Sequence, residues 1–79
     1  MLKINYYVQQ EFLIVELQGF LNYHTIITFE EEIIDLIKHL EINNIKFNLQ
    51  DLEYLDESGF EKLMECFKIV KKFSEIKKI

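Results

Sequence analysis

The sequence contains no alanine, arginine, proline or tryptophan, and it has one cysteine and two histidines. The lone cysteine, Cys66, cannot form an intrachain disulfide, and its place inside an apolar helical pattern favours a buried thiol over a nucleophile. His24 and His39 have no metal-ligand spacing with the cysteine or with an acidic cluster. The sequence therefore predicts no metal site and no other cofactor.

Positive charge is scarce, and no long hydrophobic run is present. All nine basic residues are lysines, whereas 14 residues are acidic, so the net charge is −5. Proteins that read nucleic acid need basic patches and usually arginine, which argues against a nucleic-acid partner. A membrane span needs about 18 consecutive apolar residues, and the N-terminal Met1–Ile4 lacks a signal-peptide pattern. We therefore expect a cytoplasmic protein with no membrane partner.

The first half of the chain predicts two strands and a helix. Apolar residues alternate along Leu2–Val8 and run more continuously along Phe12–Leu17. The polar turn between them is short enough for an antiparallel hairpin. After a connection at Gly19–His24, apolar residues in Thr25–Leu40 recur at intervals of three and four, which predicts a helix.

Two N-caps are candidates for this first helix. Thr28 and Glu31 fit a capping box, and Thr25 is the rival cap. The acidic triplet Glu30–Glu32 lies near the helix start, where the helix dipole stabilises negative charge. We interpret the triplet as a solvated helix face.

The second half predicts a short strand, Ile45–Leu49, a loop and a second helix that begins at Ser58 or Gly59. Leu52 and Leu55 are expected to anchor the loop to the core. A helix joins the second and third strands, which favours a parallel pair with a right-handed crossover. The order strand–strand–helix–strand–helix predicts one α/β domain over residues 1–79, with helices packed on a small mixed sheet.

Ser58 has the most informative position in the chain. It lies in the run Leu55–Phe60, between a strand and a helix, where backbone N–H groups have no intrahelical partner and the helix dipole favours a negative group. Ser58 and Glu61 also fit a capping box. The residues alone therefore leave two interpretations, a helix cap or a hydroxyl placed to carry a phosphate.

Two segments resemble the STAS domain family, the fold of sulfate transporters and anti-sigma factor antagonists. Gly19–Thr25 resembles the turn before that family's first helix. Ile45–Gly59, which ends in Asp-Glu-Ser-Gly, resembles its central strand and phosphorylation loop. The order and spacing are preserved over nearly the whole chain. The chain is most similar to stand-alone bacterial anti-sigma factor antagonists of the sporulation type.

The resemblance implies a regulatory function through protein–protein interaction. In such proteins a loop serine is phosphorylated by a partner that is both a serine kinase and an anti-sigma factor. The unphosphorylated antagonist binds that partner and frees the sigma factor, so that transcription is regulated. Carried over by position, the phosphoacceptor is Ser58, and the expected partner-binding residues are Asn22, His24, Thr25, Asp56, Glu57 and Gly59.

The chain departs from the family pattern in three ways. Asn22 stands where aspartate is frequent, and Glu57 and Glu61 stand where small residues are frequent. Complete family domains continue with further strands and helices, so the resemblance implies a C-terminally short domain.

Residues 73–79 fit either a continued helix or the beginning of a fourth strand. An open sheet edge is also a template for self-association into a homodimer.

Two kinds of function follow, and neither is enzymatic. The first is a phosphorylation-switched antagonist, and the alternative is a non-phosphorylated scaffold or self-associating module in another regulatory complex. The sequence contains no Ser/His/Asp arrangement, no glycine-rich phosphate loop and no metal motif, so no catalytic residue is predicted. The adjacent carboxylates of Asp56 and Glu57 lack the separation of a catalytic pair.

Overall fold

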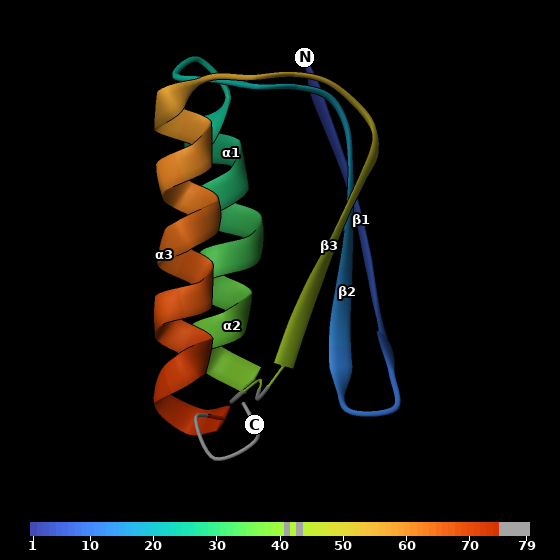
Figure 1. Ribbon diagram of the computed structural model, residues 1–79, viewed down its shortest axis with the longest axis vertical. Coiled ribbons are helices and arrows are strands. Elements are labelled where there is room, and N and C mark those ends of the chain that lie inside the picture. The colour runs from blue at the N-terminus through green and yellow to red at the C-terminus, as the bar shows by residue number, and fades with distance from the viewer. Residues whose placement is uncertain (41, 43, 75–79) are drawn as a thin grey trace.

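The computed structural model describes residues 1–40, 42 and 44–74, which form a three-stranded sheet with helices on one face (Figure 1). The strands are β1 (Leu2–Gln9), β2 (Phe12–Leu21) and β3 (Asn44–Leu55). The helical segments are α1 (Ile26–Phe29), the π-helical segment η1 (Glu30–Ile34), α2 (Asp35–Leu40) and α3 (Glu57–Ser74). Of residues 73–79, for which the sequence left helix and strand open, 73 and 74 belong to α3, and 75–79 lie outside the described part of the chain.

The sheet has the predicted mixed topology. β1 and β2 form an antiparallel hairpin, β2 and β3 run parallel, and β2 lies in the middle. The hairpin turns at Gln10, whose φ of 59° is in the left-handed region. The expected α/β fold with the order strand–strand–helix–strand–helix is confirmed.

β3 is longer than the sequence predicted, because two irregularities change its register with β2. Asn48 pairs with Glu16 but Asp51 with Gln18, and a second shift follows Leu52. Each shift inserts one extra residue into β3, as in a β-bulge. Leu49, Leu52 and Leu55, three positions apart, thereby all pack against the core from within the strand. A strand of period two could not place residues at this spacing on one face, which is why the sequence predicted a loop.

A single continuous helical stretch fills the first crossover. It begins at Ile26, one residue later than predicted, and Thr25 occupies the N-cap position without a capping hydrogen bond from its side chain. Thr28 lies inside α1, so the predicted capping box of Thr28 and Glu31 is wrong. The acidic triplet lies within η1, as Glu30–Glu32.

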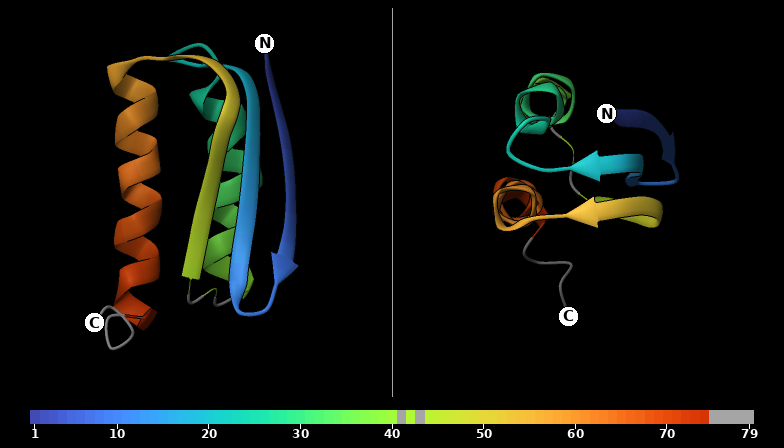
Figure 2. Two further views of the ribbon diagram at one scale, coloured as in Figure 1. Left: turned by 45° about the vertical axis from the view of Figure 1, so that its right-hand side comes forward. Right: turned by 90° about the horizontal axis from the view of Figure 1, so that it is seen from above.

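The core lies between the sheet and the helices, which cover the same sheet face in both views of Figure 2. β2 contributes alternate residues to it, as its apolar run predicts. The helices contribute stripes at intervals of three and four. The fully buried side chains are those of Leu13, Val15, Leu17, Leu21, Phe29, Ile33, Ile37 and Cys66. Within the described residues, no helix is long and apolar enough to cross a membrane.

Lys62 joins α3 to η1 through an ion pair. Its Nζ donates to Glu30 Oε2 in η1 and to Glu65 Oε1 in its own helix. The hydrogen bond to Glu30 is the main reason that the pKa of Lys62 is raised. No local sequence pattern indicates the pair of Lys62 with Glu30, because the two residues are 32 positions apart in the chain.

We expect the free energy of unfolding to fall at alkaline pH because of Cys66. Burial raises the pKa of its thiol to about 12, and the charge of Glu65 acts in the same direction. An unfolded thiol ionises near pH 8.5, so the stabilisation is complete below that pH and is lost as the pH rises toward 12. In the native chain, the free energy of unfolding measured with urea should be up to about 2 kcal/mol lower at pH 10 than at pH 8. Cys66→Val should lack this difference. Equal losses in both chains would contradict this.

Candidate functional site

The candidate site lies where β2 and β3 end side by side. Leu21 and Leu55 are the last paired residues of these parallel strands. The loop after β2 leads into α1, and Asp56 leads from β3 into α3 (Figure 1). In open α/β sheets, binding sites form outside the carboxyl ends of the parallel strands. The predicted site residues, which come from two distant segments, therefore meet at one end of the molecule.

Asp56 connects these two segments. Its Oδ2 accepts a hydrogen bond from the Tyr23 N–H at 3.1 Å, and its Oδ1 accepts one from the Gly59 N–H at 2.8 Å. Its own N–H donates to the Leu21 carbonyl at 3.2 Å. Asp56 is thus the N-cap of α3, and it also fixes the loop that follows β2.

Ser58 is not the N-cap of α3. The helix begins at Glu57, so Ser58 is its second residue. The Ser58 side chain is partly buried, and its hydroxyl has no hydrogen-bond partner among the described residues. The predicted capping box of Ser58 and Glu61 is therefore wrong, because the preceding aspartate supplies the capping oxygen. The hydroxyl is left in the first helical turn, where N–H groups have no intrahelical acceptor.

Asn22 and Thr25 organise the loop before α1. The Asn22 Oδ1 accepts hydrogen bonds from the N–H groups of His24 at 2.9 Å and Thr25 at 3.2 Å. The Thr25 hydroxyl donates to the Phe20 carbonyl at 2.9 Å and accepts from the Asn22 N–H at 3.0 Å. These two residues act on the conformation of their own loop, which presents His24 to solvent.

Tyr23 is a site residue that the sequence analysis did not single out. Tyr23 is 65% exposed, and its ring lies 4.1 Å from the His24 ring, measured between centroids. Its backbone N–H makes the contact with Asp56 described above. Almost every residue type has a backbone N–H, so this hydrogen bond cannot be predicted from the sequence. Only the aromatic residue between Asn22 and His24 could have indicated this position.

Gly59 is required by the close approach of α3 to the end of β2. A Cβ atom at this position would lie 2.6 Å from the Leu21 carbonyl oxygen and 2.9 Å from Leu55 Cδ1. Contacts this short do not occur, so any side chain would push the helix away from the sheet. The approach places the first turn of α3, including Ser58, directly beside the ends of both strands.

The electrostatic surroundings of Ser58 are acidic. Asp56, Glu57 and Glu61 flank it in the chain, and the last two are exposed. The nearest lysine in sequence, Lys62, already contacts two carboxylates. No group of three histidine, cysteine or acidic side chains within the described residues could hold a metal ion. The site therefore offers a serine hydroxyl at the start of a helix.

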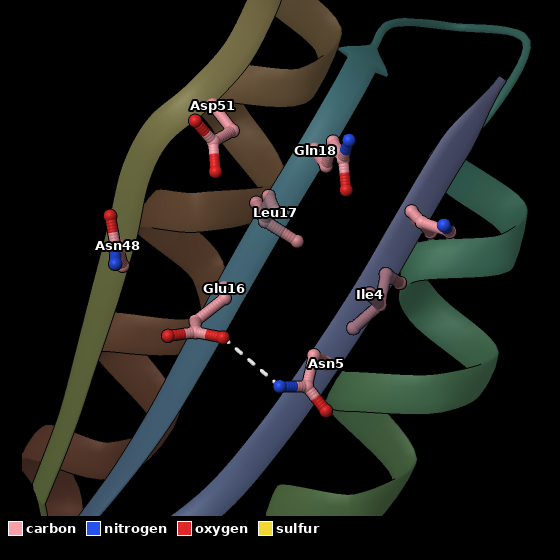
Figure 3. Close-up of a pocket in the computed structure, with 8 residues that line it drawn as sticks. Ile4, Asn5, Glu16, Leu17, Gln18, Asn48 and Asp51 are labelled. Carbon is pink, nitrogen blue, oxygen red and sulfur yellow. Dashed lines mark hydrogen bonds between the residues drawn. The ribbon is translucent and has the colours of Figure 1, made fainter.

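A shallow polar pocket lies elsewhere, on the sheet face away from the helices (Figure 3). Glu16 of β2 accepts a hydrogen bond there from Asn5 Nδ2 of β1 at 3.0 Å. Gln18, Asn48 and Asp51 contribute further polar groups. None of the predicted site residues lines this pocket.

Comparison with known proteins supports the fold. A family model described as the STAS domain matches residues 3–74. Among solved structures, the chain is similar to the anti-sigma factor antagonist SpoIIAA in its unphosphorylated form, with 19% sequence identity and a TM-score of 0.72. The similarity covers 91% of this chain and 64% of that structure. This chain therefore spans somewhat less than two thirds of the length of SpoIIAA, and over that part the two share a fold.

The assignment of the α3 cap predicts different costs for two neighbouring substitutions. Asp56→Ala removes the capping oxygen and the contact with Tyr23, so it should lower the free energy of unfolding by about 1–2 kcal/mol. Ser58→Ala removes a hydroxyl that does not cap, so it should change stability by less than about 0.5 kcal/mol. Urea denaturation followed by circular dichroism measures both. A larger cost for Ser58→Ala than for Asp56→Ala would refute the assignment.

Gly59→Ala should destabilise the protein although alanine is the better helix former. Helix propensity alone favours the substitution by about 1 kcal/mol, but the new Cβ would force α3 away from Leu21, at a cost of about 1–3 kcal/mol or more. We expect a net loss of at least about 1 kcal/mol in urea denaturation. Glu57→Ala, at an exposed position in the same turn, is the control. Unchanged or increased stability in Gly59→Ala would mean that the helix does not approach the strand so closely.

Proposed function

Because the chain belongs to the STAS domain family, we propose that it is an interaction module similar to anti-sigma factor antagonists. Its partner in this proposal is an anti-sigma factor with serine kinase activity, and phosphorylation of Ser58 switches the interaction off. While Ser58 is unmodified, the chain binds the anti-sigma factor, and the sigma factor is released and active. Once Ser58 is phosphorylated, the anti-sigma factor binds the sigma factor again. The protein then works in the cytoplasm, together with the transcription machinery and ATP.

The observation that carries the proposal is the position of the Ser58 hydroxyl. It lies in the first turn of α3, has no hydrogen-bond partner among the described residues, and is not needed to cap the helix. Helix N-termini favour negative groups through their N–H groups and the helix dipole. A kinase could therefore modify Ser58 without removing a contact that the fold needs.

The surface around Ser58 supports docking of a protein partner. The loop after β2 presents the exposed Tyr23 and His24 rings, which lie against each other at an interplanar angle of 33°. Asp56 ties that loop to the beginning of α3, next to Ser58 and the exposed Glu57. Aromatic residues are enriched in protein interfaces, so we assign Tyr23 to the docking surface together with the partner-binding residues predicted from the sequence.

Phosphorylation would act on the partner through charge and bulk. A phosphate adds a charge of about −1.5 to −2, and Asp56, Glu57 and Glu61 are acidic neighbours in the chain. Lys62 already pairs with Glu30 and Glu65, so it is not available as a counter-ion without breaking those contacts. Since Asp56 and not Ser58 caps α3, the fold should be the same in both states.

The test uses the purified chain with an anti-sigma factor kinase from the same genome. Ser58→Ala should bind the kinase as the native chain does and take up no phosphate from ATP. Ser58→Asp should bind about tenfold more weakly, because one added charge opposes the interface. Ser74→Asp makes the same chemical change at the last residue of α3 and should leave affinity unchanged. Calorimetry measures the affinities, and mass spectrometry locates the phosphate.

Two results would overturn the switch. One is the absence of phosphate on Ser58 after incubation with kinase and ATP, and the other is equal binding by Ser58→Ala and Ser58→Asp. The acidic neighbours of Ser58 and the engaged Lys62 favour the alternative in that case. The protein would then be a scaffold that binds its partner constitutively, or a module that self-associates.

A further inference from the structure

Lys62 lies one helical turn after Ser58 on α3. Residues four positions apart in a helix lie on the same side of it, with about 5–6 Å between their Cβ atoms. Both residues are helical, since α3 runs from Glu57 to Ser74. Helical side chains also lean toward the N-terminal end of their helix, which directs the stem of Lys62 toward the turn that contains Ser58. The ammonium group of Lys62 is therefore within reach of a group carried by the Ser58 hydroxyl.

The contact between α3 and η1 shows which side of α3 these two residues occupy. α1 and α3 begin at the same end of the molecule and run in the same direction (Figure 1). Lys62 contacts Glu30, which lies four residues after Ile26, the first residue of α1. Ser58 lies four residues before Lys62, so it faces the beginning of α1, in agreement with its partly buried side chain.

The present partners of Lys62 can release it at little cost. Its Nζ donates to Glu30 Oε2 in η1 and, at 3.2 Å, to Glu65 Oε1 in α3. Both glutamate side chains are 41% exposed, so water can solvate either carboxylate once Lys62 leaves. Partly exposed ion pairs are weak, and lysine carries its charge on a flexible stem. Lys62 can therefore change partners without movement of either helix.

A phosphate on Ser58 would be a stronger acceptor than either glutamate. It carries a charge of about −1.5 to −2 and three acceptor oxygens, whereas each glutamate carries a single negative charge. Its acidic neighbours in the chain, Asp56, Glu57 and Glu61, would repel it. Lys62 is the one basic residue within four positions of Ser58 in the sequence. The phosphate therefore favours a change of partner by Lys62.

We propose that phosphorylation of Ser58 draws Lys62 away from Glu30 and Glu65 to the phosphate. The Lys62 ammonium group forms an ion pair with the phosphate oxygens, and both glutamates become free. Lys62 has this role only in the modified protein, so the role rests on the function proposed above. The freed Glu30 adds an unpaired charge beside Glu31 and Glu32 of η1. Modification of Ser58 thereby changes the charge of a second helix while the fold stays the same.

The test uses the full chain with phosphoserine placed at position 58 during synthesis, so that no kinase is needed. Phosphorus NMR measures the pKa of the second ionisation of the phosphate, which is about 6 without perturbing neighbours. A nearby cation favours the dianion and lowers this pKa. Lys62→Met should therefore raise the phosphate pKa by about 0.5. Lys68→Met removes the same charge at an exposed position of α3 and should leave it unchanged.

A second pair of variants tests the competition with Glu30. Glu30→Gln removes one of the two partners of Lys62, so the phosphate pKa should fall. Glu32→Gln removes the same charge at an exposed position of η1 and should have a smaller effect. In the Lys62→Met background, the difference between these two substitutions should largely disappear, because Glu30 acts on the phosphate through Lys62.

Equal phosphate pKa values in Lys62→Met and Lys68→Met would overturn the proposal. So would a difference between Glu30→Gln and Glu32→Gln that persists unchanged without Lys62. Failure of a kinase to modify Ser58 would overturn the proposed function instead, and the phosphate pKa values do not depend on that result.

Discussion

A single carboxylate holds the candidate site together. Asp56 bonds the Tyr23 N–H with one oxygen and the Gly59 N–H with the other, while its own N–H bonds the Leu21 carbonyl. Together, the two side-chain hydrogen bonds contribute about 1–2 kcal/mol. Since all three involve one residue, the loop after β2, the end of β3 and the start of α3 keep one relative geometry. The position of Ser58 in that frame depends on them, and the short distance between Gly59 and Leu21 is possible only without a side chain.

Because Asp56 and not Ser58 caps α3, Ser58 could be modified without loss of the cap. A serine that capped its own helix would exchange a stabilising contact for a phosphate, and modification would disturb the fold. Here the cap belongs to Asp56, so the hydroxyl of the partly buried Ser58 is not needed for helix stability. Modification would then add charge beside the acidic neighbours of Ser58, and it would not refold the domain.

The fold was largely predictable because its signals are local. Apolar alternation and helical periodicity gave the order of the elements and the parallel pairing of β2 with β3. The length of β3 was missed, because Leu49, Leu52 and Leu55 have a spacing that fits a strand only when two extra residues are accommodated in its pairing with β2. Lys62 was missed as a bridge for a similar reason, since its partner Glu30 lies on another helix.

By itself, the sequence determined which residue types stand between a strand and a helix, and hence that a hydroxyl lies near a helix start with Asn22, His24 and Thr25 in the preceding connection. It offered Ser58 as the cap of α3, although Asp56 in the same short run also has an oxygen that could cap the helix. Only the tertiary structure showed that Asp56 supplies the cap, and that the same carboxylate accepts a hydrogen bond from Tyr23, 33 residues away. Such a contact depends on where two parallel strands end in space, and no local pattern of residues encodes that position.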